Sequence, residues 1–231
     1  MTSLGRTFFA CVLLLASACS PAEPPTVSER TPDASSASNA PNAPKLPRIV
    51  ILGDSLTAGL GLDRDEAFPA LLQQRLNALG YRYEVVNAGV SGDTTAGGLR
   101  RLEWSIEGNT RILVVALGGN DGLRGLPASD TRKNLNEIIA RAQRRGIAVV
   151  LAGMEAPPNY GSAYTTEFRQ VFRDLAKSHD VVFIPFLLEA VAGVPALNQP
   201  DGIHPNVEGA RAVERLVWAA IEPIVEGSPA R

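Results

Sequence analysis

The segment Arg48–Gly59 reads RIVILGDSLTAG and joins an apolar run directly to a polar turn. Its first half is rich in β-branched residues, which is typical of a strand buried in a sheet. The strand is expected to end at Gly53, and Asp54 and Ser55 follow at once. Asp and Ser are common helix N-caps, because their side-chain oxygens accept hydrogen bonds from free backbone N–H groups. The segment alone leaves open whether these two side chains cap a helix or belong to a functional site.

Strands and helices are predicted to alternate from Arg48 onward. Short apolar runs predict strands at 48–53, 83–87, 111–117, 147–152 and 181–184. Apolar residues at helical spacing, with glycines after several of the stretches, predict helices at 67–79, 95–107, 131–145, 164–178 and 206–224. Nearly continuous apolar strands separated by helices predict a five-stranded parallel sheet covered on both faces. The expected fold class is α/β, a three-layer α/β/α sandwich of the doubly wound, flavodoxin-like type.

Residues 1–18 have the pattern of a secretory signal peptide. One positive charge precedes a short apolar run, and small residues follow it. The run is shorter than the roughly 20 residues that span a bilayer. Leu15–Cys19 reads LASAC and resembles the lipobox of bacterial lipoproteins, although that motif usually has Leu where Ala16 stands. We expect cleavage to leave Cys19 as a lipidated N-terminus; ordinary cleavage after Ala18 is the alternative.

The stretch that follows Cys19 separates this signal from the folded domain. Residues 20–47 are mainly Pro, Ala and Ser, with almost no large apolar side chain, and are expected to form a disordered tether. The expected organisation is a signal peptide at 1–18, a lipidated linker at 19–47 and one domain at 48–231. The protein should therefore be exported and held at the periplasmic face of a bacterial membrane, or be soluble and exported if Cys19 carries no lipid.

Composition narrows the possible functions. The 231 residues are 45% hydrophobic, carry a net charge of −2 and contain no Lys/Arg-rich run, so no nucleic-acid partner is expected. The two cysteines, Cys11 and Cys19, lie before the domain, which leaves it without a disulfide or thiol nucleophile. With only His179 and His204 as histidines, no metal site is expected. His179 is assigned a structural place at a helix end, and neither a P-loop nor a dinucleotide-binding fingerprint is present.

Polar residues and glycines follow the predicted strands. The segments concerned are Gly53-Asp54-Ser55, residues 87–95, Gly118-Gly119-Asn120-Asp121, residues 153–161 and residues 201–206. The carboxyl ends of parallel strands meet at one edge of the sheet, where the sites of doubly wound folds lie. These segments are therefore expected to gather around one site.

His204 is the histidine best placed for chemistry. Asp201 stands three residues before it, Gly202 permits a tight bend, and Pro205 keeps His204 out of the helical region. A carboxylate in such a turn can hold the imidazole so that Nε2 is free to act as a base for a serine hydroxyl. A loop histidine followed by a helix, with Asp201 as a cap, is the alternative.

Four separated blocks together resemble the SGNH hydrolases, also called GDSL esterases and lipases. The resemblance covers about residues 48–225, and it is strongest to the bacterial multifunctional thioesterase, lysophospholipase and arylesterase group. The blocks are Gly53-Asp54-Ser55-Leu56, Ser91-Gly92-Asp93, Gly118-Gly119-Asn120-Asp121 and Asp201-Gly202-Ile203-His204-Pro205-Asn206. Residues 118–127 and 158–161 also look like stretches of that group.

The resemblance implies a serine hydrolase. Ser55 would be the nucleophile, His204 the general base and then acid, and Asp201 the residue that orients the imidazole. The oxyanion hole would consist of the Ser55 N–H, the Gly92 N–H and the Asn120 side-chain amide; turn chemistry is the alternative reading of Gly92 and Asn120. Asp54 would support the turn by hydrogen bonds. No cofactor is implied.

The resemblance also implies that residues 122–127 form a loop over an acyl-binding groove. Leu123 and Leu126 would supply apolar surface, and Arg124 would either steer an anionic head group or stay solvated. The other expected substrate-binding residues are Gly122, Pro158 and Tyr160. Expected substrates are small esters, thioesters or lysophospholipids. Among the thioesters, acyl-CoA would rarely reach an exported enzyme. The alternatives are a carbohydrate acetyl esterase of the cell envelope and a non-catalytic lipid-binding lipoprotein.

Overall fold

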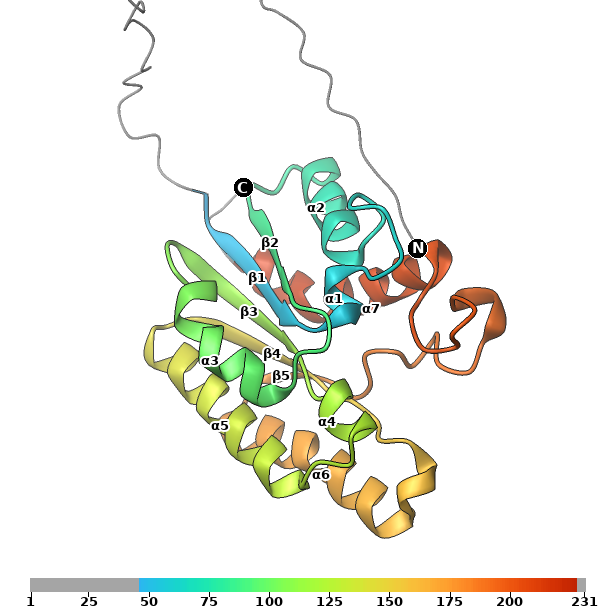
Figure 1. The fold of residues 1–231 in the computed structure, drawn as a ribbon. Coiled ribbons are helices and arrows are strands. Elements are labelled where there is room, and N and C mark those ends of the chain that lie inside the picture. Colours follow the sequence, from blue (N-terminus) through green and yellow to red (C-terminus); the bar gives the residue numbers. More distant parts are fainter. Residues whose placement is uncertain (1–45, 228–231) are drawn as a thin grey trace, which may run out of the picture. The chain divides into compact units, whose positions relative to one another are not determined.

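A parallel sheet forms the central layer of residues 46–227, the part of the chain that the computed structural model describes (Figure 1). Its strands are β1 (Arg48–Gly53), β2 (Glu84–Gly89), β3 (Thr110–Ala116), β4 (Ala148–Ala152) and β5 (Val182–Ile184). Their order is β2-β1-β3-β4-β5, and every neighbouring pair is parallel. This is the strand order of flavodoxin-like sheets, so the predicted fold class is confirmed.

Helices cover both faces of the sheet. They are α1 (Ser55–Ala58), α2 (Phe68–Ala78), α3 (Thr95–Ser105), α4 (Gly119–Leu123), α5 (Ala128–Arg144), α6 (Ser162–His179) and α7 (Val207–Glu226). Short 3₁₀ turns span Pro158–Tyr160 and Pro195–Leu197. The helices α2 and α7 pack together on one face, and α3, α5 and α6 pack on the other (Figure 1). None of the helices within residues 46–227 is long and apolar enough to cross a membrane.

The core is centred on β1 and β3. The side chains of Ile49–Leu52 and Leu113–Ala116 have no solvent exposure, as expected for strands covered on both faces. At the carboxyl end of β1, a Cβ on Gly53 would lie 1.9 Å from Thr57 Oγ1 and 3.0 Å from the carbonyl oxygen of Ala116. Glycine is therefore required where β1 turns sharply into α1, and this turn brings Ser55 to the edge of the sheet.

Two helices differ from the sequence-based expectation. Helix α5 begins at Ala128, three residues before the predicted start at Thr131. Helix α4 lies where residues 122–127 were expected to form a loop, so Gly122 and Leu123 are helical and only residues 124–127 connect α4 to α5. A five-residue helix has too few turns to show apolar periodicity, which explains why the sequence pattern did not indicate it.

Candidate active site

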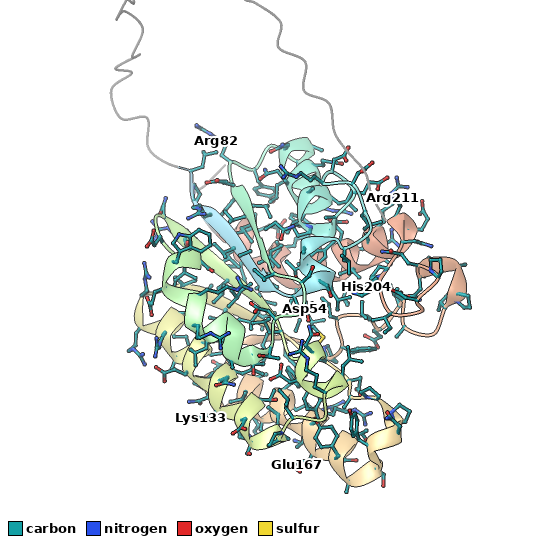
Figure 2. The ribbon with its side chains drawn as sticks, viewed as in Figure 1. Asp54, Arg82, Lys133, Glu167, His204 and Arg211 are labelled. Carbon is teal, nitrogen blue, oxygen red and sulfur yellow. The ribbon has the colours of Figure 1, made fainter. Side chains whose placement is uncertain are left out.

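Of the two roles considered for Asp54 and Ser55, Asp54 caps a helix and Ser55 belongs to the candidate site. Asp54 is the N-cap of α1, because its Oδ1 accepts a hydrogen bond from the Leu56 N–H at 3.0 Å. Ser55 is the first residue of that helix, and its Oγ lies 2.9 Å from His204 Nε2. Asp54 and His204 both lie at the edge of the sheet formed by the carboxyl ends of the strands (Figure 2). The structure thus brings together two residues 149 positions apart in the sequence.

The turn before α7 fixes the orientation of His204. Asp201 Oδ2 lies 2.6 Å from His204 Nδ1, and Asp201 Oδ1 accepts hydrogen bonds from the backbone N–H groups of Ile203 and His204. Because an ionised carboxylate only accepts hydrogen bonds, Nδ1 carries the proton and Nε2 is left to accept one from Ser55. Gly202 has a φ of +69°, a conformation that glycine adopts at no steric cost.

The same contacts keep Asp201 ionised. Its pKa falls to about 2, mainly because the backbone N–H of His204 donates to the carboxylate, with further contributions from the imidazole and the Ile203 N–H. The Asp201 side chain is nevertheless 46% exposed, whereas that of His204 is only 16% exposed. The arrangement is therefore a shielded imidazole held by a carboxylate that partly faces solvent.

Asn120 connects the turn that carries Ser55 to the loop that contains Gly92. Asn120 lies in the first turn of α4, and its Nδ2 donates to the Asp93 carbonyl at 3.0 Å and to Asp54 Oδ2 at 3.3 Å. Gly92 has a φ of +82° and is exposed in the loop before Asp93. The structure thus places Asn120 and the Gly92–Asp93 loop against the turn that carries Ser55.

Asp54 itself differs electrostatically from Asp201. Its side chain is 2% exposed, and burial raises its pKa to about 6, although hydrogen bonds from the Leu56 N–H and the Asn120 amide partly offset this effect. The family resemblance implied only that Asp54 supports the turn by hydrogen bonds. Its burial depends on the packing of α1, α4 and the sheet, which no local pattern reveals.

Four of the six predicted substrate-binding residues fall into two groups. Leu123, Pro158 and Tyr160 are exposed, and Tyr160 Oη donates to the Leu123 carbonyl at 3.0 Å. Gly122 is buried instead, where a Cβ would lie 3.2 Å from the ring of Phe168. Leu123 and Tyr160 therefore present apolar surface to solvent, and Gly122 serves close packing.

The other two predicted substrate-binding residues, Arg124 and Leu126, each make a hydrogen bond that sequence reasoning did not anticipate. The Arg124 guanidinium donates to the Gly92 carbonyl at 2.9 Å, so it binds the oxyanion-hole loop in addition to facing solvent. The Leu126 carbonyl accepts a hydrogen bond from Tyr164 Oη at 2.7 Å. Tyr164 was not among the predicted site residues, because the sequence identified it only as the start of the helix predicted at 164–178.

An apolar pocket opens beside the Ser55–His204 pair, on the side of α2 and α7. Its free volume is about 10 Å³, enough for about one water molecule. Its lining residues are Ser55, Leu56, Gly59, Leu60, Leu62, Phe68, His204, Pro205, Ala210 and Val213. Most of these side chains are apolar, so a small apolar group attached to the reacting carbon or oxygen would find a complementary surface there.

Several known proteins are similar to this chain in sequence. The model of the GDSL-like lipase/acylhydrolase family matches residues 51–212. Esterase TesA of Pseudomonas aeruginosa is 42% identical over 178 residues, covering 77% of this chain and 89% of that protein. The thioesterase 1/protease 1/lysophospholipase L1 of Escherichia coli K12 is 36% identical, covering 77% of this chain and 84% of that protein.

Solved structures give the same result. The crystal structure of TesA matches with a TM-score of 0.74 at 42% identity, covering 77% of this chain and 99% of that one. AlinE4, described as an SGNH-hydrolase family esterase, matches with a TM-score of 0.65 at 44% identity, covering 80% and 98%. The chain therefore belongs to the GDSL-like lipase/acylhydrolase family and is an ester hydrolase, as the resemblance of its four sequence blocks predicted.

Proposed function

We propose that Ser55 attacks the carbonyl carbon of an ester and that His204 is its base. The observation that carries this proposal is the 2.9 Å contact between Ser55 Oγ and His204 Nε2, with Asp201 on the opposite ring nitrogen. As the Oγ–carbon bond forms, the hydroxyl proton passes to Nε2. His204 then gives that proton to the leaving alcohol, and an acyl-serine remains. A water molecule, deprotonated by His204, attacks the acyl carbon, releases the carboxylic acid and restores Ser55.

The negative charge that develops on the carbonyl oxygen must be stabilised by hydrogen-bond donors. We assign this role to the N–H groups of Ser55 and Gly92 and to the Asn120 amide. In this structure one N–H of Asn120 donates to the neutral carbonyl of Asp93. A charged oxyanion is a better acceptor than a neutral carbonyl, so an Asn120 N–H gains most from turning toward the substrate in the transition state. Such donors raise kcat more than they improve ground-state binding.

The proposed substrates are esters with an apolar acyl or aryl group, including lysophospholipids. Exposed Leu123 and Tyr160, together with the apolar pocket beside Ser55, support this class. The relatives named esterase, arylesterase and lysophospholipase support it as well. A cell-envelope carbohydrate acetyl esterase is the second candidate, because a pocket with about 10 Å³ of free volume suits a group no larger than a methyl.

The proposed location is the periplasmic face of a bacterial membrane, with lipid on Cys19. The LASAC motif at residues 15–19 supports lipidation, and the Pro-, Ala- and Ser-rich stretch after it would reach roughly 30 Å as a flexible coil. Soluble export after ordinary cleavage is the alternative. The signal peptide, Cys19 and nearly all of the linker lie outside the described residues.

Hydrolysis of p-nitrophenyl esters from acetate to palmitate tests the proposed function. Ser55→Ala should lower kcat at least 10³-fold, since catalysis by the remaining groups is weak, while circular dichroism and thermal unfolding stay close to wild type. Ser178→Ala is the matched control, because that hydroxyl donates to the Leu175 carbonyl on α6, away from the site. It should keep wild-type activity.

The same experiment separates the alternatives. A maximum at medium or long chains supports lipid-like esters, and activity confined to acetate favours the acetyl esterase. A fluorophosphonate should label wild type and Ser178→Ala but not Ser55→Ala. More than a few per cent of wild-type activity in pure Ser55→Ala would exclude the proposed nucleophile. Absence of fluorophosphonate labelling in a wild type that still hydrolyses esters would contradict the acyl-serine mechanism.

A further inference from the structure

Arg101 lies on α3 and its guanidinium reaches the carboxyl-end edge of the sheet. Its Nε donates to Asp93 Oδ2 at 2.7 Å, Nη1 to the Ala88 carbonyl at 2.7 Å, and Nη2 to the Gly53 carbonyl at 2.8 Å. The three acceptors come from β2, the loop after it and the end of β1. One side chain therefore connects the end of β1 to the end of β2 and to the loop that directly follows β2.

Two of these acceptors adjoin the proposed reacting groups. Gly53 stands two residues before Ser55, and its carbonyl also accepts the Val90 N–H from the segment that follows β2. Asp93 directly follows Gly92, and its own carbonyl accepts the Asn120 amide. Through these contacts the position of Arg101 is coupled to the nucleophile on one side and to the oxyanion donors on the other.

The environment of the Arg101–Asp93 ion pair favours one fixed geometry. Both side chains are only 17% exposed. At Gly97, one turn before Arg101, a Cβ would lie 2.2 Å from Asp93 Oδ1, so glycine is needed for the carboxylate to approach α3. A planar guanidinium directs donors toward several acceptors at once, which a lysine ammonium on a flexible chain cannot reproduce.

We propose that Arg101 is a positioning residue for ester hydrolysis. It holds the end of β1, the end of β2 and the Gly92–Asp93 loop in one register, so that Ser55 and the oxyanion donors face the same point. Arg101 acts through Asp93 and Gly53 and does not touch the substrate. This inference rests on the proposed function, because it assumes that Gly92 and Asn120 stabilise the oxyanion.

The test compares Arg101→Met and Arg101→Lys with Arg75→Met. Arg75 makes a comparable ion pair with Glu214, at 2.6 Å and 2.8 Å, but lies on α2 against α7. For a medium-chain p-nitrophenyl ester, Arg101→Met should lower kcat about 10²-fold, the lower end of the loss of an oxyanion donor, and leave KM within about threefold. Arg101→Lys should recover part of kcat. Arg75→Met should lower the melting temperature without lowering kcat.

A double variant distinguishes positioning from general stability. If Arg101 acts through the oxyanion donors, the kcat loss in Arg101→Met/Asn120→Ala should be at least about tenfold smaller than the product of the two single losses. Inactivation by a fluorophosphonate, which forms a tetrahedral adduct on Ser55, should slow in parallel with kcat. A merely structural role would change the melting temperature without this non-additivity.

Three results would overturn the proposal. One is a wild-type kcat in folded Arg101→Met or, should that variant not fold, in Arg101→Lys. Another is a kcat loss in the double variant that equals the product of the two single losses. The third is an equal loss of kcat in Arg75→Met. Failure of the proposed function itself would show separately, as retained activity in Ser55→Ala.

Discussion

Asp54 and Asp201 are two carboxylates near one hydroxyl, and their environments move their pKa values in opposite directions. Asp201 receives two backbone N–H groups and the imidazole, which lower its pKa to about 2. Asp54 is buried, which raises its pKa to about 6 despite its hydrogen bonds. Asp201 therefore stays ionised well below neutral pH, while Asp54 changes charge at about pH 6.

The titration of Asp54 should appear in the stability of the protein. Its folded pKa is raised above the ordinary aspartate value of 3.8, so its contribution to the unfolding free energy is fully present below about pH 4 and lost as pH rises through about 6. Asp54→Asn removes this dependence. Relative to wild type, the variant should gain stability between pH 4 and 7, by on the order of 3 kcal/mol. Urea unfolding of both proteins across this range measures the difference.

Titrating groups that do not interact with Asp54 cancel in this comparison, because the two proteins share them; His204, whose charge lowers the pKa of Asp54, does not cancel. The absolute offset between variant and wild type also contains the lost charged acceptor for the Leu56 N–H and the Asn120 amide, so only the slope with pH is diagnostic. A stability difference that stays constant from pH 4 to 7 would mean that Asp54 titrates alike in the folded and unfolded states.

At the scale of elements, a row of aromatic rings on α6 and on the 3₁₀ turn before it supports the segment that carries Asn120. Neighbouring rings along Tyr160, Tyr164, Phe168 and Phe172 have centroids 5.5, 5.8 and 5.5 Å apart. Glycines of residues 118–125 face these rings: a Cβ would lie 2.8 Å from Phe172 at Gly118, 3.2 Å from Phe168 at Gly122 and 2.6 Å from Tyr160 at Gly125. This row of aromatic rings therefore sets how closely α4 packs against α6.

Gly118→Ala tests this packing. Gly118 has a φ of +114°, and the added methyl group would also meet the Phe172 ring. We expect the unfolding free energy to fall by about 3 kcal/mol, from backbone strain and overpacking together. Gly146→Ala is the matched control, since Gly146 has a φ of +70° and open space around it; strain alone should cost about 1 kcal/mol.

Guanidinium unfolding measures both losses. Gly118→Ala should also lower kcat, because Gly118 is the N-cap of the helix that carries Asn120, whereas Gly146→Ala should not. Adding Phe172→Leu to Gly118→Ala should recover part of the stability by making room for the methyl group. Equal losses in the two alanine variants would show that the aromatic row does not limit the packing of α4.

At the scale of the whole molecule, the proposed anchor and the hydrolase domain lie in different parts of the chain. If Cys19 is lipidated, wild-type protein should sediment with membranes, and Cys19→Ser should move it to the soluble exported fraction with unchanged specific activity. Cys11→Ser is the control, because Cys11 lies in the apolar run that cleavage removes. Immunoblots of membrane and soluble fractions measure the distribution. A soluble wild-type protein would indicate ordinary cleavage after Ala18.

Most of the fold could be predicted because it depends on local pattern. Each of the five predicted strands occurs within about two residues of its expected bounds, since a strand buried on both faces is a continuous apolar run. The long amphipathic helices also follow from their periodicity. Helices α1 and α4, four and five residues long, could not be predicted in this way, because their backbone is set by the turn after β1 and by contacts with α6.

The sequence by itself determined the sheet, its doubly wound topology and the set of residues gathered at its carboxyl edge, because apolar periodicity and the rules of parallel connection act along the chain. Tertiary structure alone decided how these residues interact. Examples are the burial of Asp54 against Asn120, the contact of Arg124 with Gly92 and the three hydrogen bonds of Arg101. These contacts join residues up to 66 positions apart in the sequence. Hydrogen bonds and desolvation depend on distance in space, and spacing along the chain does not encode that distance.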